Sequence, residues 1–217
     1  MPAEYAVDPK NEVILAYEMN DSPLPQEHGF PVRMVCPGQI AVRSCKWVNE
    51  LFVSDEMADS APQRRDYKIV KEQEMSQVKW DELEPVYGHP INSGIAFPQE
   101  GQVVKKGEKI EIKGWAHGDG TKGTQATQVE LSFDEGQTWR KVNSLIMEDK
   151  PVGRKVFSWT LWNYVLDTGS LPNSDRISVQ VRATDSTGAV QNGKISELFN
   201  LRGILNNSPM QVSFSLK

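Results

Sequence analysis

Basic and imidazole side chains recur between Leu15 and Val48, in a stretch that is also rich in proline and glycine. His28, Arg33, Arg43 and Lys46 lie between the short apolar runs of this stretch. The prolines and glycines make the backbone turn often, and the basic groups offer charged hydrogen-bond donors. Such a segment is suited to holding an anionic ligand. The residues alone equally allow a proline-rich surface connection with scattered charge.

Other motifs that could carry chemistry have simpler interpretations. Residues 118–123, GDGTKG, match the letters G-x-G-x-x-G. A dinucleotide site needs that motif between a parallel strand and a helix, whereas strand-like sequence lies on both sides here. We therefore expect a loop between strands.

Cys36 and Cys45 are the only cysteines of the chain. Two cysteines are too few for a disulfide framework, and with three scattered histidines they lack the spacing of a structural zinc site. We expect two buried or half-buried thiols.

Length and composition are typical of a soluble globular protein of one or two domains. The chain has 217 residues, of which 24% are charged and 38% hydrophobic, and its net charge is -5. This charge argues against a nucleic-acid partner. No run approaches the roughly 18 apolar residues of a membrane span. Residues 1–13 have no apolar core and no Arg-rich amphipathic pattern, so we expect no targeting signal in this chain.

Residues 91–217 carry the alternating pattern of β-strands separated by turns. Several such strands over this length predict a β-sandwich of immunoglobulin-like size. The predicted strands are 103–115, 127–133, 155–162, 177–184 and 210–216. The turn signals are Lys106-Gly107, Asp134-Glu135-Gly136, Thr187-Gly188 and Asn192-Gly193. We expect four tryptophans to fill the core: Trp115, Trp139, Trp159 and Trp162.

Residues 1–90 are a poor candidate for an independent domain. Their apolar runs are short and their middle is rich in proline, so they would bury too little surface to offset the entropy lost on ordering. Short strands are predicted at 34–36, 39–42 and 46–53. We expect this part to pack against an upstream portion of the protein or against another subunit.

Several motifs of the first part resemble, in order, the molybdopterin domain of eukaryotic-type sulfite oxidases and plant nitrate reductases. These are LAYEMN at 15–20, a Pro-x-Pro pair at 23–25, HGFPVR at 28–33, a PG turn at 37–38 and a KW pair at 46–47. The resemblance continues through nearly the whole chain. It implies a mainly β protein, in which residues 1–90 are the C-terminal portion of an α+β molybdopterin-binding domain. Residues 91–217 would then be an immunoglobulin-like dimerisation domain.

The resemblance assigns cofactor contacts to two segments. His28 and Arg33 of the HGFPVR motif would contact the pterin, and Ser44, Cys45 and Lys46 would form a second contacting segment. The molybdenum–molybdopterin cofactor carries a phosphate and several ring acceptors, to which imidazole, guanidinium and ammonium groups can donate hydrogen bonds. The family's molybdenum-ligating cysteine belongs to an upstream motif that is not found here. Neither cysteine of this chain is therefore expected to bind the metal.

Two further residues would line the substrate pocket by the same resemblance. Tyr67 stands in a setting where sulfite oxidases have a tyrosine beside the metal, and a phenol there can donate a hydrogen bond and help relay protons. Arg202 lies in an NLRG motif whose arginine reaches the substrate in that family. A planar five-donor cation suits a compact oxyanion such as sulfite. Nitrate reductases generally lack arginine here, so Arg202 favours sulfite.

The implied reaction is oxygen-atom transfer to sulfite, which gives sulfate, with two electrons passing to a haem or cytochrome-type acceptor. Any haem domain would lie outside this chain. The resemblance also implies a homodimer and, in a eukaryote, the mitochondrial intermembrane space. Two alternatives stay open. One is a truncated, non-catalytic paralogue that acts as an accessory or interaction subunit, and the other is a nitrate-reductase-like enzyme.

Overall fold

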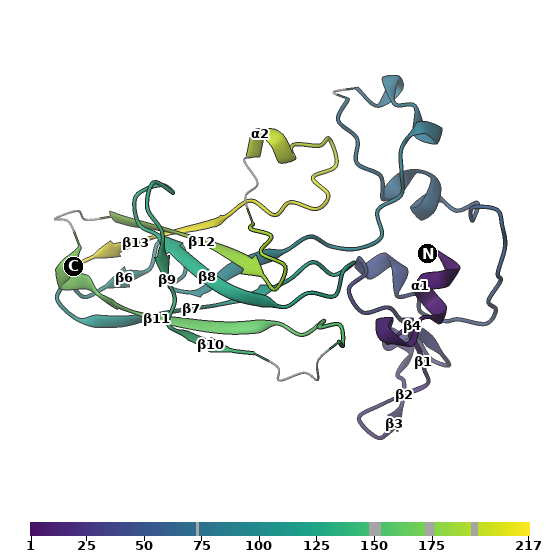
Figure 1. Cartoon of the computed structure of the whole chain (residues 1–217), viewed down its shortest axis with the longest axis horizontal. Coiled ribbons are helices and arrows are strands. Elements are labelled where there is room, and N and C mark those ends of the chain that lie inside the picture. Colours follow the sequence, from purple (N-terminus) through teal and green to yellow (C-terminus); the bar gives the residue numbers. More distant parts are fainter. Residues whose placement is uncertain (73, 148–152, 172–175, 192–194) are drawn as a thin grey trace. The chain divides into compact units, whose positions relative to one another are not determined.

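The computed structural model describes residues 1–72, 74–147, 153–171, 176–191 and 195–217, which form two compact units (Figure 1). The first unit comprises Met1–His89, Gly120–Lys122 and Phe199–Asn206. The second comprises Pro90–Asp119, Gly123–Leu198 and Asn207–Lys217. Among the described residues, no helix is long and apolar enough to cross a membrane.

The second unit is a sandwich of two β-sheets (Figure 1). The four-stranded sheet has the order β10 (Ser144–Ile146), β11 (Thr160–Asp167), β7 (Lys109–His117), β5 (Asn92–Phe97). The five-stranded sheet has the order β6 (Val103–Val104), β13 (Met210–Leu216), β12 (Arg176–Asp185), β8 (Ala126–Ser132), β9 (Arg140–Lys141). Of the strand pairs described, only β6 with β13 is parallel. The expected mainly β sandwich is therefore confirmed.

Alternating side chains of the two sheets meet in one hydrophobic core. Along β12, the residues from Ile177 to Ala183 alternate between buried and half-buried, which is the period of two that the sequence shows. Phe214 of β13 is 1% exposed, and Trp162 of β11 is 3% exposed. Gly114 of β7 makes room for Trp162, because a Cβ there would lie 2.3 Å from the indole ring. Most of the core comes from the strands of the two sheets, and the loop residues Ile91, Val142 and Leu171 complete it.

The prediction that all four tryptophans fill the core is wrong for three of them. Only Trp162 belongs to the buried cluster, while Trp115 and Trp139 are half-buried and Trp159 is 57% exposed. Trp159 precedes β11 and stacks on Trp115, with ring centroids 4.9 Å apart. Trp139 lies over Arg182, 4.1 Å from its guanidinium carbon. Indole rings can cover a sheet surface as well as fill its interior.

Strands β8, β12 and β13 lie where alternation predicts them. The predicted strand 103–115 is wrong as a single strand, because it is divided into β6 and β7, which belong to different sheets. Strand β11 begins at Thr160 rather than near residue 155. The last pair between β11 and β7 joins Thr160 to Ala116, and β7 ends one residue later at His117. The residues before Trp159 therefore have no part of β7 to pair with. The GDGTKG stretch is a loop between β7 and β8, as predicted. The predicted turn at Asn192-Gly193 lies outside the described residues.

The first unit consists of short elements joined by turns. It contains two small antiparallel pairs, β1 (Ile14–Ala16) with β4 (Arg33–Val35) and β2 (Glu18–Met19) with β3 (Ser22–Pro23). Its helical segments are α1 (Ala3–Val7), a π-helical turn at Pro62–Asp66 and 3-10 turns at Pro9–Asn11, Gln26–His28, Ala41–Arg43, Met75–Gln77 and Trp80–Glu82. The second unit adds a 3-10 turn at Thr168–Ser170 and the short helix α2 (Ile195–Leu198).

Two of the three strands predicted in the first unit are absent. Residues 39–42 lead into a 3-10 turn, and only Gln39 makes a single bridge, to Gly88. Residues 46–53 form no strand, because Trp47 has a left-handed φ of 55° that interrupts an extended backbone. Phe52 and Val53 are 81% and 88% exposed. The apolar residues of this stretch therefore lie on the surface and do not belong to a sheet.

Candidate functional site

The two segments that carry the predicted cofactor residues lie side by side in the first unit. The backbone N–H of Met34 donates to the carbonyl of Cys45 over 2.8 Å, and that of Val48 donates to the carbonyl of Val32 over 2.8 Å. These bonds fix residues 44–48 along the HGFPVR segment. The structure therefore brings together two stretches that the sequence separates by a proline-glycine turn.

Gly29 lies at the closest approach of the two segments. It is buried and has a φ of 112°, a conformation that side chains with a Cβ rarely adopt. A Cβ at this position would lie 3.0 Å from the Cβ of Arg33 and 3.1 Å from that of Lys46. Glycine is required here for both reasons, and it lets the two cationic residues lie close together.

Arg33 is half-buried and only partly engaged. Its Nη1 donates to the carbonyl of His28 over 3.2 Å. Its Nε is buried and finds no hydrogen-bond partner among the described residues. A buried guanidinium N–H without a partner is costly, so a bound acceptor would stabilise this site. His28 ends an exposed 3-10 turn, and the contact with Arg33 is made by its backbone carbonyl.

Lys46 supplies a second cation from the facing segment. Its Nζ donates to the carbonyl of Glu27 over 2.6 Å and lies 5.6 Å from the centroid of the Trp47 ring. Ser44 accepts a hydrogen bond from the backbone N–H of Cys36 over 3.0 Å. All five predicted cofactor residues thus lie on two adjoining segments.

The two cysteines differ in their surroundings. Cys36 is 3% exposed, and burial, followed by the nearby Cys45 thiol, raises its pKa above the ordinary value for cysteine. This confirms the prediction of a buried thiol for Cys36. Cys45 is exposed, so the same prediction is wrong for it.

Arg43 is part of the interior of this unit rather than of a ligand site. Its Nε donates to the carbonyl of Val86 over 3.1 Å, and its Nη1 donates to the side chain of Gln63. Its guanidinium carbon lies 4.8 Å from the ring centroid of Tyr87. Burial lowers the pKa of Arg43 from its ordinary value. Composition alone could not separate this structural arginine from Arg33.

Arg202 is anchored beside the other predicted pocket residue. Its Nη1 donates to the backbone carbonyl of Asp66 over 2.6 Å and lies 3.4 Å from the carboxylate of the same residue. Asp66 directly precedes Tyr67, so Arg202 and Tyr67 belong to one part of the first unit. The side chain of Arg202 is 30% exposed. The structure therefore brings Arg202 into contact with Asp66, which lies 136 positions away in the sequence.

Tyr67 is half-buried and its backbone is tied to a neighbouring segment. Its carbonyl accepts from the N–H of Val86 over 2.7 Å, and the adjacent Lys68 forms a bridge with Pro85. Lys68 is only 2% exposed, and its Nζ donates to the carbonyl of Trp80 over 2.6 Å. The sequence analysis did not single out Lys68 or Asp66, although both flank Tyr67 in the same short run.

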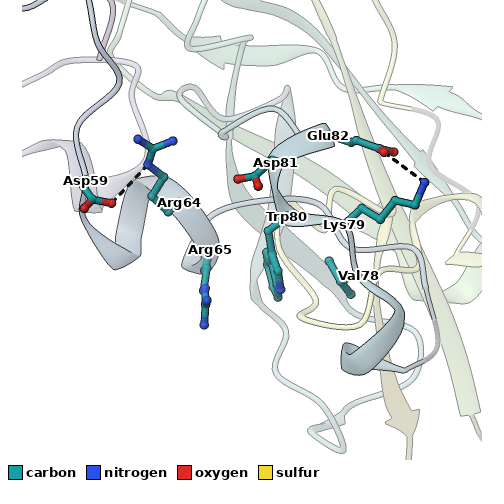
Figure 2. Close-up of a pocket in the computed structure, with 8 residues that line it drawn as sticks. All are labelled: Asp59, Arg64, Arg65, Val78, Lys79, Trp80, Asp81 and Glu82. Carbon is teal, nitrogen blue, oxygen red and sulfur yellow. Dashed lines mark hydrogen bonds and ion pairs between the residues drawn. The ribbon is translucent and has the colours of Figure 1, made fainter.

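An open cleft of about 660 Å³ adjoins this group of residues (Figure 2). Its lining is Asp59, Arg64, Arg65, Val78, Lys79, Trp80, Asp81 and Glu82. Arg64 pairs with Asp59 over 3.5 Å, and Lys79 pairs with Glu82 over 3.1 Å. Figure 2 shows Arg65 and Trp80 pointing to the same side of the cleft. A search of the described residues finds no group of three or more His, Cys, Asp or Glu side chains that could hold a metal ion.

Two protein families match the chain in sequence. Residues 1–62 match the oxidoreductase molybdopterin binding domain, and residues 84–216 match the Mo-co oxidoreductase dimerisation domain. The mitochondrial sulfite oxidase of Drosophila melanogaster is 35% identical over 226 residues, an alignment that covers 100% of this chain and 38% of the fly protein. The NADPH nitrate reductase of Aspergillus niger is 30% identical over 236 residues, which cover 97% of this chain and 26% of that enzyme.

The fold has a counterpart among solved structures. The crystal structure of the sulfane dehydrogenase SoxCD from Paracoccus pantotrophus matches with a TM-score of 0.76 and 24% identity, over 97% of this chain and 50% of that one. The chain thus spans half or less of the length of each of these proteins. The resemblance read from the motifs is confirmed. The chain belongs to the molybdopterin-dependent oxidoreductases of the sulfite oxidase family, and it joins a Mo-co oxidoreductase dimerisation domain to a segment of the molybdopterin-binding domain.

Proposed function

We propose that this chain supplies part of the cofactor site, part of the substrate pocket and the dimer interface of a sulfite-oxidising molybdenum enzyme. Residues 1–90 would belong to the cofactor domain and residues 91–217 to the dimerisation domain. The observation that carries the proposal is the anchoring of Arg202 to Asp66, next to Tyr67. It supports the proposal because Arg202, a cation suited to a small oxyanion, contacts the residue that directly precedes Tyr67.

The residues near Gly29 fit a molybdopterin group. The unpartnered Nε of Arg33 and the ammonium of Lys46 offer charged donors for a phosphate, and the absence of a side chain at Gly29 leaves room close to the backbone. His28, Ser44 and Cys45 add polar atoms on the same two segments. When bound, the molybdenum cofactor would supply oxygen-atom transfer and would hold two electrons. The protein's own task here is to bind and orient it.

Arg202 and Tyr67 would act on the substrate. The guanidinium would neutralise part of the charge of sulfite and fix its orientation, since it offers several N–H donors in one plane. The Tyr67 phenol would donate a hydrogen bond to an oxygen atom of the anion and would pass a proton to or from solvent.

Nitrate reduction is the second candidate, and the similarity to the Aspergillus nitrate reductase favours it. Arg202 argues against it by the family resemblance, because nitrate reductases generally lack arginine at this position. Nitrate also carries a single negative charge, so it gains less from an added guanidinium than doubly charged sulfite does.

The proposed partners follow from the rest of the family. The second unit would pair with the same unit of another copy, in keeping with the dimerisation domain that it matches. The sheet that contains β10 and β11 exposes Ile146, Leu161 and Val165 on neighbouring strands, and we propose that these side chains are covered in the dimer. The electrons would leave to a cytochrome-type acceptor. In a eukaryote the enzyme would work in the mitochondrial intermembrane space.

The proposal is tested by replacing Arg202 in the enzyme purified from its own source. Arg202→Met is expected to raise the Michaelis constant for sulfite about 10- to 100-fold, because a charge-assisted hydrogen bond contributes about 1.5–3 kcal/mol. Arg176→Met is the matched control, since Arg176 lies in the second unit and pairs with Glu100 over 3.1 Å. An unchanged constant for sulfite in Arg202→Met, or faster turnover of nitrate than of sulfite by the unaltered enzyme, would refute the assignment.

A further inference from the structure

We infer that Trp80 is a positioning residue for Arg202, and that together with Asp66 it holds the guanidinium so that one edge is presented to an oxyanion. The inference rests on the proposed role of Arg202 in binding the substrate. It extends that role by naming the groups that set the orientation of the guanidinium. All three residues lie in the first unit.

Asp66 anchors one end of the guanidinium. Only Nη1 of Arg202 has hydrogen-bond partners in the described part of the chain, namely the carbonyl and the carboxylate of Asp66. Nε and Nη2 therefore have no protein acceptor there. Two such neighbouring N–H groups are the pair that binds an oxyanion through two parallel hydrogen bonds.

Trp80 supports the plane of the guanidinium. The Cζ of Arg202 lies 5.8 Å from the centroid of the indole ring, within the range of a cation–π contact. A single anchor at Nη1 would let the guanidinium rotate about that bond. The contact with the half-buried ring restricts this rotation, and it favours the charged group without using any of its N–H donors.

The segment that carries Trp80 is itself held in place. The Nζ of Lys68 donates to the carbonyl of Trp80 over 2.6 Å, and Lys68 is 2% exposed. A buried ammonium needs such an acceptor, because burying it unpaired is costly. The Lys68–Pro85 bridge ties the same two segments a few residues further along. Asp66 lies two residues before Lys68 in the chain. The bond from Lys68 therefore fixes the backbone of Trp80 relative to the segment that carries Asp66.

The loop that carries Arg202 is also locked. The side chain of Asn200 accepts from the N–H of Ile204 over 2.9 Å and donates to its carbonyl over 2.8 Å. The backbone N–H of Leu201 donates to the carbonyl of Val70 over 2.8 Å. Both ends of the Arg202–Trp80 contact are thus fixed by hydrogen bonds, which is how a binding group is kept ready before its ligand arrives.

The test compares four variants of the purified enzyme: Trp80→Leu, Trp80→Phe, Arg202→Met and the double variant Trp80→Leu with Arg202→Met. The dissociation constant of sulfate is measured by calorimetry on the oxidised enzyme, which does not turn over, and kcat and the Michaelis constant for sulfite are measured separately. Trp139→Leu is the matched control, because it removes an arginine–tryptophan contact from the second unit.

We expect Trp80→Leu to raise the sulfate dissociation constant and the sulfite Michaelis constant about tenfold, with a smaller change in kcat. Trp80→Phe should restore most of the loss, since it keeps an aromatic face. The double variant should bind sulfate no more weakly than Arg202→Met alone, because Trp80 acts through Arg202. Trp139→Leu should leave both constants unchanged.

Two results would overturn the inference. In one, Trp80→Leu binds sulfate as the unaltered enzyme does while Arg202→Met does not. In the other, the Trp80→Leu loss persists in full when Arg202 is already methionine. If Arg202→Met itself leaves sulfate binding and the sulfite Michaelis constant unchanged, the proposed function fails as well, so the two failures are distinguishable.

Discussion

The two units differ most in how they bury their apolar side chains. In the described part of the sandwich, nineteen buried hydrophobic residues form one cluster. In the first unit, the described buried hydrophobic residues are Leu24, Cys36, Val70, Val78 and Val86. The same unit exposes a larger set, including Tyr17, Phe30, Trp47, Phe52 and Val53. The sandwich is therefore stabilised by its own core, while the first unit has apolar surface that another part of an assembly could cover.

Buried polar groups differ in kind between the two units. In the sandwich, Asp185 is 2% exposed, yet its carboxylate accepts hydrogen bonds from Thr124, Thr187 and the N–H of Ala189. In the first unit, the buried Nε of Arg33 has no partner among the described residues. The sandwich also has buried polar atoms without a partner among the described residues, such as the Nε1 of Trp162 and the Oγ of Ser178. Arg33 differs from these because its unpartnered atom belongs to a cation and lies beside a required glycine, a combination that suits a ligand site.

The largest effect should come from the sandwich core. Phe214→Ala is expected to lower the free energy of unfolding by about 3–5 kcal/mol, because it leaves a cavity in a fully packed interior. The matched change in the first unit, Phe30→Ala, removes a ring that is 54% exposed and should cost under about 1 kcal/mol. Denaturant unfolding of the two variants measures both values. Equal losses would mean that the contrast in packing is not real.

The exposed sheet face gives the next prediction. Leu161→Glu should convert the dimer to monomers, because it places a charge among apolar side chains that we propose to be covered. Val103→Glu changes a residue of similar exposure, 55% against 50%, on the other sheet, and should leave the dimer intact. Native mass by light scattering distinguishes the two. If Leu161→Glu stays dimeric, the interface lies elsewhere on the molecule.

A smaller effect is expected at Gly29. Gly29→Ala should destabilise the first unit by about 1–2 kcal/mol and reduce the amount of molybdenum retained, because φ is 112° and the new Cβ would press on Arg33 and Lys46. Gly101→Ala in the second unit meets the same positive-φ penalty but no atom within 4 Å. Metal analysis of both proteins should show a loss only in the first.

The smallest effect concerns acid stability of the sandwich. Hydrogen bonds from the side chain and backbone of Thr138, and then from Ser132, lower the pKa of Asp134 to about 2. The stabilisation is therefore complete above the ordinary carboxyl pKa of 3.8 and is lost as the pH falls from there through about 2. Asp134→Asn should show a weaker decline in melting temperature between pH 5 and pH 2 than the unaltered protein. An identical decline would remove Asp134 from this account.

Alternation and turn residues were enough to predict the sandwich, because each strand there has one face in a shared core. The same reasoning failed at residues 46–53, where Trp47 adopts a left-handed conformation that no pattern of apolar letters reveals. It also failed for Trp159, whose ring covers a sheet surface. Trp159 lies just before the start of β11 at Thr160, and its side chain is 57% exposed although indole is large and apolar.

The candidate site was predictable only in part. The family resemblance selected Arg33 and Arg202, but composition could not separate them from Arg43, which hydrogen-bonds within the first unit. Trp80 was not among the candidate site residues predicted from the sequence. Its contact with Arg202 depends on residues more than 120 positions apart, so local sequence carries no signal for it. Asp66 could have been found from the sequence, because it directly precedes the predicted pocket residue Tyr67.

Molybdenum content, measured together with native mass on the protein purified from its own source, tests the central claim most directly. Our account predicts stoichiometric molybdenum in an assembly that contains two copies of this chain and exceeds the mass of two 24.4 kDa chains. Such a result would mean that the proposed cofactor residues near Gly29 and the proposed substrate residue Arg202 belong to an enzyme that contains its molybdenum cofactor. An assembly without molybdenum would contradict the account, and it would indicate an accessory subunit that keeps the family's fold without its chemistry.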